Sequence, residues 1–257
     1  MTLRVNMAEM TWTAYRDRIS KGSPVLLPVG ALEQHGPHMA MGVDHLVPAA
    51  ICREVAQGLD GIVAPAIAYG YKSQPRMGGG NDFPGTTSLD AAHLVGIIRD
   101  VICELARHGA RRIAVVNGHY ENMMFTIEAV DLALRDLRRD GIDDVTLVRC
   151  EYWDYTRTAT LNAVFPDGFP GWALEHAAVF ETSLMLHLHP DMVQMDLVPD
   201  EPPASFPPHD THPLPPGRVP PSGVLSPART ATAEKGRFLF ENQVSDLLAA
   251  LRAEFRL

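Results

Sequence analysis

Short apolar runs alternate with stretches of helical periodicity over the first 150 residues. The apolar runs have the length of buried strands and lie at 25–30, 62–67, 113–116 and 145–148. Apolar residues at helical spacing follow in 45–57, after Asp90 and after His119, and these stretches end at Gly58, Gly109 and Gly141. The alternation predicts an α/β fold with a mainly parallel sheet that is covered on both faces, in which ligands bind at the carboxyl ends of the strands.

The second half of the chain has weaker patterns. Residues 175–188 and 234–256 are expected to be helical. Residues 199–227 contain 11 of the 21 prolines, a composition that resists both helix and sheet, and we expect a proline-rich arm there. The length of 257 residues fits one large α/β domain or two small ones.

The composition of the chain argues against nucleic-acid and membrane partners and indicates a reducing compartment. The formal net charge of −9 disfavours binding to nucleic acid, because such a surface repels phosphate. No apolar run is long enough for a membrane helix, and the N-terminus does not resemble a secretory signal. The three cysteines are widely spaced and are interpreted as buried thiols in a reducing compartment. We therefore expect a soluble, cytoplasmic protein without nucleic-acid or membrane partners.

Two polar clusters follow predicted strands. Glu33, His35 and Asp44 come after the first strand, and His119 and Glu121 come after the third. The carboxyl ends of parallel strands share one edge, so these two imidazoles and three carboxylates should converge. This set suits Zn²⁺ or Mn²⁺, and five ligands fit two metal ions that share a carboxylate and a water. A purely structural polar cluster, with Asp44 as a helix cap, is the alternative.

Three further residues are candidates for the chemistry. His176 follows a turn rich in Pro and Gly, at the expected start of a helix, where an imidazole could transfer a proton near neutral pH. Trp153 and Trp172 flank that turn and could cover a flat polar ligand, although packing in the core is the alternative for each. We expect structural or surface roles for the remaining histidines, which are His38, His45, His93, His108, His187, His189, His209 and His212.

Several segments resemble the creatininase (creatinine amidohydrolase) family, and the resemblance runs from about residue 10 to 255. It is carried by PVGALEQHGPHM at 28–39, GGGNDFPGTTSLD at 78–90, NGHYEN at 117–122 and VFETSLML at 179–186. The resemblance implies a single domain over 1–257 with a three-layer α/β/α fold, and a homo-oligomer, typically a hexamer. The implied activity is the metal-dependent opening of a small cyclic amide, with creatinine converted to creatine.

The resemblance also implies roles for individual residues. One metal ion would be held by Glu33, Asp44 and His119. A second would be held by His35, Asp44 and Glu121, with Asp44 bridging. Tyr120 and Trp172 would contact the substrate, Trp153 would close over it, and His176 would move the proton.

Two positions depart from the family pattern near the substrate. Met77 and Ala173 stand where creatininase has polar residues, and neither can make their hydrogen bonds. Another cyclic amide, or a formamide or other linear C–N bond, is therefore an alternative substrate. A metal-stabilised assembly protein without catalysis is the alternative from another class.

Overall fold

The fold is organised around a sheet of four parallel strands. The computed structural model describes residues 4–74 and 80–257. The strand order is β2-β1-β3-β4, and every neighbouring pair is parallel. The strands are β1 (Val25–Val29), β2 (Ile62–Val63), β3 (Arg112–Asn117) and β4 (Thr146–Glu151). The predicted parallel sheet is confirmed, although β2 is much shorter than the apolar run that predicted it.

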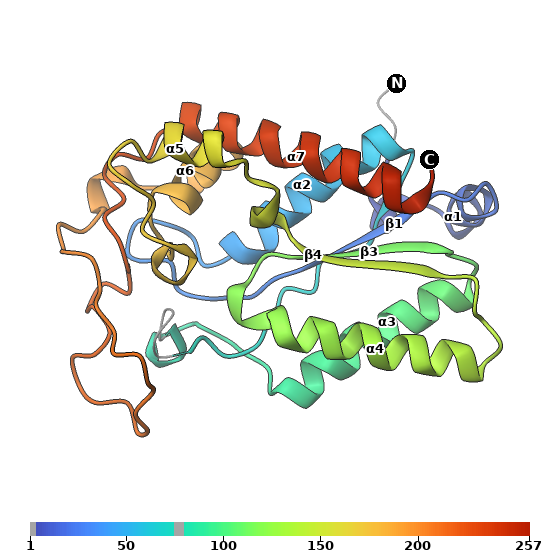
Figure 1. The fold of residues 1–257 in the computed structure, drawn as a ribbon, viewed down its shortest axis with the longest axis horizontal. Coiled ribbons are helices and arrows are strands. Elements are labelled where there is room, and N and C mark those ends of the chain that lie inside the picture. The colour runs from blue at the N-terminus through green and yellow to red at the C-terminus, as the bar shows by residue number, and fades with distance from the viewer. Residues whose placement is uncertain (1–3, 75–79) are drawn as a thin grey trace.

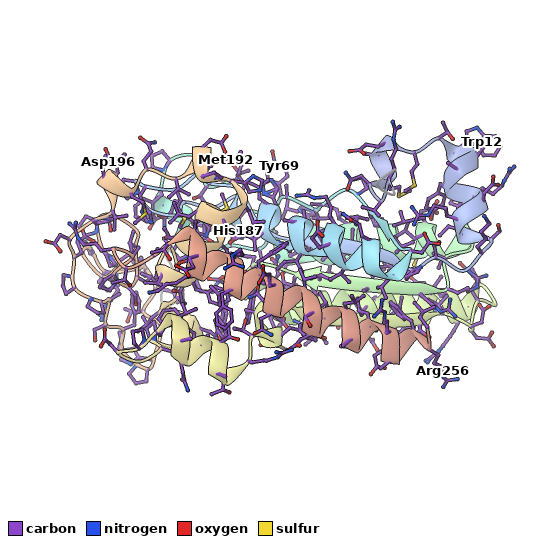
Figure 2. All side chains as sticks on the ribbon, turned by 90° about the horizontal axis from the view of Figure 1, so that it is seen from above. Trp12, Tyr69, His187, Met192, Asp196 and Arg256 are labelled. Carbon is purple, nitrogen blue, oxygen red and sulfur yellow. The ribbon has the colours of Figure 1, made fainter. Side chains whose placement is uncertain are left out.

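Helices cover both faces of the sheet, which confirms the three-layer α/β/α architecture (Figure 1). One face carries α2 (Val43–Leu59), α6 (Val179–Leu188) and α7 (Ala233–Phe255), and the other carries α3 (Ala91–Arg107) and α4 (Met123–Arg139). Seen from above, α7 runs alongside α2 (Figure 2). Of the helices within the described residues, none has the length and apolarity to cross a membrane.

The strands divide their side chains between two cores. In β1, Leu26 packs into the core under α2, α6 and α7, whereas Val25 and Leu27 pack into the core under α3 and α4. This is the alternation expected of a strand whose successive side chains point to opposite faces. Because both faces are covered, the strands appear in the sequence as continuous apolar runs.

Some elements differ from the sequence-based expectation. Helices α1 (Trp12–Ile19) and α5 (Thr158–Val164) were not predicted, because both are short and largely exposed. Helix α6 begins at Val179 instead of 175, after a turn in which Ala177 takes a φ of 55°. Residues 199–227 form no helix or strand, as predicted, and this proline-rich arm runs along one end of the molecule (Figure 1).

Two glycines allow the first turn of α2 to approach the sheet closely. A Cβ atom at Gly30, after β1, would lie 2.2 Å from the backbone oxygen of Asp44, and one at Gly118, after β3, would lie 2.3 Å from the same atom. The helix begins at Val43, so Asp44 lies inside its first turn and is not the predicted cap. The glycines thus place Asp44 between the ends of the two central strands.

We predict that Gly118→Ala lowers the free energy of unfolding by about 1–3 kcal/mol, because the methyl group has no room beside Asp44 and Pro48. Gly96→Ala is the matched control, since a Cβ atom at that position of α3 meets nothing within 4 Å. There we expect a gain of about 0.5–1 kcal/mol from helix propensity. Urea unfolding measures both, and equal stability of the two variants would contradict the close packing.

Candidate active site

Three of the predicted ligands meet at the carboxyl ends of β1 and β3. Nδ1 of His119 lies 3.0 Å from Oδ2 of Asp44 and 3.2 Å from Oε2 of Glu33. All three side chains are buried. Together they form a compact group whose donor atoms could hold one metal ion.

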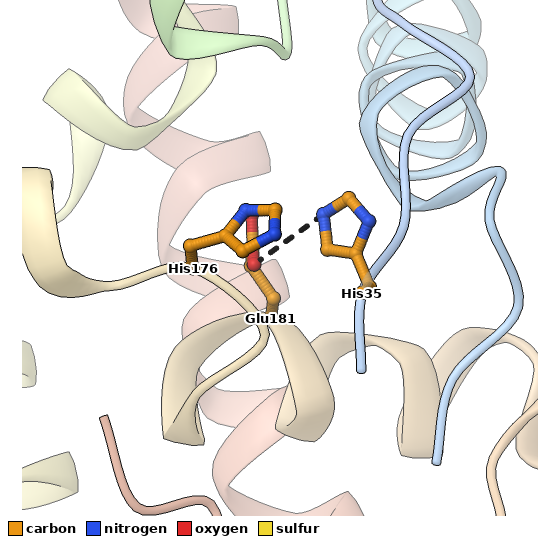
Figure 3. Close-up of side chains that lie close together, drawn as sticks. All are labelled: His35, His176 and Glu181. Carbon is orange, nitrogen blue, oxygen red and sulfur yellow. Dashed lines mark ion pairs between the residues drawn. The ribbon is translucent and has the colours of Figure 1, made fainter. Parts of the chain in front are cut away.

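A second group of candidate ligands consists of His35, His176 and Glu181, and it meets the first group at Asp44. Nε2 of His35 lies 3.1 Å from the other Asp44 oxygen, Oδ1, and 3.6 Å from Oε2 of Glu181 (Figure 3). The ring of His176 lies beside that of His35, with 4.5 Å between the ring centroids. Asp44 therefore stands between two imidazoles and offers one carboxylate oxygen to each.

Backbone carbonyl groups fix which nitrogen of each imidazole faces Asp44. Nδ1 of His35 donates to the carbonyl of Glu33 at 3.0 Å, and Nε2 of His119 donates to the carbonyl of Tyr71 at 2.9 Å. The Asn122 side chain supports this arrangement, because it accepts from the amide of Tyr71 and donates to the carbonyl of Gly30. In the neutral form of each ring, the nitrogen next to Asp44 carries the lone pair that metal binding requires.

Several donor atoms at this point are buried without a hydrogen-bond partner among the described residues. They are Oε1 of Glu33, Nε2 of His35 and Oδ2 of Asp44. Buried polar atoms are rarely left unpaired, so their convergence indicates a ligand that accepts electron pairs. Imidazole and carboxylate donors suit zinc or manganese. The residues present thus fit a pair of divalent ions.

The electrostatics of the cluster favour positive charge. Burial alone would raise the pKa of Asp44, but the His35 and His119 imidazoles outweigh it and hold that pKa far below its ordinary value. Burial opposes protonation of His35 and His119, but the surrounding carboxylates raise the pKa of both well above the ordinary value. The site therefore attracts cations, whether they are protons or metal ions.

Glu121, the expected partner of His35 at the second ion, contacts His119 and the loop before residue 75. Its Oε2 is 3.4 Å from Nε2 of His119, the nitrogen that faces Tyr71, and its Oε1 accepts from the backbone amide of Gln74 at 2.8 Å. Burial, with the charge of Glu33 adding to it, raises the pKa of Glu121 to about 7. Glu121 lies on the cavity wall, and neither of the two groups of candidate ligands contains it.

Glu181 lies beside His35, and the sequence analysis did not single it out. The left-handed backbone at Ala177 lets its amide donate to Oε2 of Glu181 at 2.7 Å. Glu175 fixes the same turn by accepting from the amide of Phe180 at 2.6 Å. The segment VFETSLML contains Glu181, but no spacing rule relates position 181 to position 35.

A small cavity opens beside the two metal-binding groups. Its wall includes Tyr120, Trp153 and Trp172, the predicted substrate contacts, and His176, the predicted proton donor. The Trp153 ring lies 6.2 Å from both the Tyr120 and the Trp172 rings, measured between centroids. His176 is buried three residues before α6 and not within its first turn.

The structure describes only one of the two residues, Met77 and Ala173, that depart from the family pattern. Met77 lies outside the described residues, so the structure places no side chain for it. Ala173 is exposed and is not part of the cavity wall. The wall is polar at the two metal-binding groups and aromatic opposite them, which suits a small flat ligand with a polar edge.

Comparisons with known proteins find similar sequences over almost the whole chain. A family model described as "Creatininase: Creatinine amidohydrolase" matches residues 8–251. A creatinine amidohydrolase from Pseudomonas putida is 53% identical, over 99% of each chain. A mycofactocin precursor peptide peptidase from Mycobacterium ulcerans is 31% identical, over 88% of this chain and 84% of the relative.

Solved structures extend the likeness to the whole fold. A structure described as "Creatininase Mn" and a creatininase variant of Zn–Zn type each superpose with a TM-score of 0.96. Each is 52% identical in sequence, over 98% of this chain and 99% of theirs.

His38 was expected to be structural, and the structure buries it next to the site. Its Nε2 lies 3.1 Å from Oγ1 of Thr182, at the start of α6. Burial lowers the pKa of His38 to about 4, and the positive charge of nearby His35 adds to this effect. The folded protein therefore takes up a proton at His38 only at a pH well below that at which the unfolded chain does.

Because its pKa is lower in the folded protein, His38 makes the free energy of unfolding depend on pH. Stability from His38 is present above pH 6.5 and is lost as the pH falls toward 4, because only the unfolded chain binds the proton in that window. The free energy of unfolding falls between pH 7 and pH 5, and we predict that His38→Gln makes this fall smaller by about 2 kcal/mol. Urea unfolding of the metal-free protein measures it, with exposed His108→Gln as control. An unchanged pH dependence in His38→Gln would refute the assignment.

Proposed function

The chain belongs to the creatininase family, and from that premise we propose that it is a metal-dependent amidohydrolase that opens creatinine to creatine. One observation supports this above the others. Two groups of candidate metal ligands, one of Glu33, Asp44 and His119 and the other of His35, His176 and Glu181, meet at the contact between Asp44 and His35, beside a small aromatic cavity. Water adds to the ring carbonyl carbon, the adjacent C–N bond breaks, and the released nitrogen receives a proton.

We propose that Glu33, Asp44 and His119 hold one divalent ion. His35 and Glu181 hold the second together with Asp44, which contacts His35, and His176 of the same group is left for proton transfer. Ions at such a site lower the pKa of water and polarise a carbonyl group. Glu121 is assigned instead to proton exchange at the wall, because its carboxyl group titrates near pH 7.

His176 is the residue we propose to protonate the leaving nitrogen. Its Nε2 is held by Gln34, and Nδ1 makes no hydrogen bond to the described part of the chain. Tyr120 and Trp172 contact the flat substrate, and Trp153 closes the wall behind it. The aromatic surfaces exclude water from the reacting bond, which strengthens the electrostatic interactions around it.

Zinc and manganese are the ions we propose, because imidazole and carboxylate donors suit both metals and the solved relatives are described with both. We further propose a single domain over 1–257 and a homohexamer in the cytoplasm. Exposed large apolar side chains, among them Trp12, Tyr69 and Met124, support association of copies.

A second candidate is a linear C–N bond, as in the peptide cleaved by the mycobacterial relatives. Those relatives are 30–32% identical, whereas the Pseudomonas relative is 53% identical. The small aromatic cavity also favours a compact ring over an extended peptide. We therefore place creatinine first.

Turnover of creatinine tests the proposal directly. The purified protein, supplied with Zn²⁺ or Mn²⁺, should form creatine, and stripping the metal should abolish this activity.

His176→Ala should lower kcat by roughly 10²–10⁴-fold with normal metal content, since it removes only the proton donor. Creatine formation is followed by chromatography. A protein that holds two ions but forms no creatine would refute creatinine as the substrate.

Measuring the bound metal tests whether Glu181 or Glu121 is a ligand of the second ion. We predict that Glu181→Gln lowers the bound metal from two ions per chain toward one, because it removes a ligand beside His35. Glu121→Gln should keep both ions and lose turnover. Elemental analysis after dialysis measures both variants. Loss of an ion in Glu121→Gln, with none lost in Glu181→Gln, would restore Glu121 as the ligand.

A further inference from the structure

We propose that the inner end of the proline-rich arm positions His176, and that it acts through the side-chain amide of Gln34. This inference rests on the proposed function, because it assigns the arm to the proton-transfer step. It also gives a role to Gln34, which lies between the ligands Glu33 and His35 in sequence but is not itself among the proposed ligands.

The amide of Gln34 is fixed at both ends. Its Oε1 accepts from the backbone amide of Gly36 at 2.9 Å, and its Nε2 donates to the backbone carbonyl of Gly223 at 3.0 Å. Gly223 belongs to the arm, whereas Gly36 belongs to the loop after β1. The arm therefore determines the orientation of a buried side chain that reaches the catalytic centre.

Gln34 presents both a donor and an acceptor to His176. Nε2 of the His176 ring lies 2.9 Å from the side-chain Nε2 of Gln34 and 2.9 Å from the backbone oxygen of Gln34. A protonated ring nitrogen donates to that oxygen, and an unprotonated one accepts from the amide. Nε2 thus keeps a partner in either form, and Nδ1 makes no hydrogen bond within the described part of the chain.

A second link joins the arm to the same histidine. The backbone amide of Leu225 donates to the carbonyl of His176 at 3.2 Å, and Leu225 is fully buried. Val224 packs close to Gly36, where a Cβ atom would lie 2.5 Å from its Cγ2. Residues 223–225 are thus packed into the site, whereas the outer part of the arm around Gly217 is exposed.

Two glycines of the arm provide a matched pair for the test. Gly223 and Gly217 have positive φ angles of 77° and 74°, so an alanine strains the backbone alike at both. A Cβ atom at Gly223 would lie 2.1 Å from Oε1 of Gln34, whereas one at Gly217 would meet nothing within 4 Å. Only the alanine at 223 displaces the Gln34 amide.

The experiment compares Gly223→Ala with Gly217→Ala in the metal-loaded full chain. We expect Gly223→Ala to lower kcat for creatinine by roughly 10–100-fold, because small displacements of a reacting group are costly. Its KM and metal content should stay within about twofold of the wild-type values. Gly217→Ala should keep the wild-type kcat. A wild-type kcat in Gly223→Ala would overturn the proposal.

Gln34→Ala covers the case in which Gly223→Ala does not fold. It removes the amide without adding atoms, and we expect a similar loss of kcat at unchanged metal content. In the double variant, the added methyl group has no amide to displace, so the two losses should not add. Full activity of Gln34→Ala, or additive losses, would refute the role of Gln34. If the wild-type protein itself does not turn over creatinine, the proposed function is wrong. That result differs from an active wild-type protein whose Gly223→Ala variant is equally active, which contradicts only the role of the arm.

Discussion

The close packing of the first turn of α2 against the ends of β1 and β3 is the constraint on which the site depends. Gly30 and Gly118 have no side chains, so the backbone of Asp44 lies directly against both strand ends. From there one carboxylate reaches His35 on one side and His119 on the other. A methyl group at either glycine would separate the helix from the sheet, and the shared carboxylate would no longer reach both imidazoles.

Much of the fold was readable from local patterns. The apolar runs of β1 and β3 are buried on both faces and that of β4 is half-buried, so they stand out from the amphipathic helices between them. Parallel strands bring their carboxyl ends to one edge, which is why Glu33, Asp44 and His119 could be grouped from their positions after strands. The helices α1 and α5 were missed because their exposed surfaces leave little periodic signal.

The rest of the site depends on contacts between distant parts of the chain. Glu181 reaches His35 only because the turn at Ala177 precedes α6, and a residue with positive φ that is not glycine leaves no mark in the sequence. Gln34 and His176 are 142 positions apart and meet through the packing of the arm. Such contacts are set by tertiary structure, so neither periodicity nor spacing could reveal them.

Protons and metal ions compete for the imidazole nitrogens beside Asp44. Surrounded by carboxylates, His35 and His119 hold protons more tightly than ordinary histidines do. A divalent ion can bind only when these protons leave, so loading the site acidifies the solution. Acidification reverses the exchange and ejects the ions. The proposed ligands would thereby set the lowest pH at which the protein keeps its metal ions.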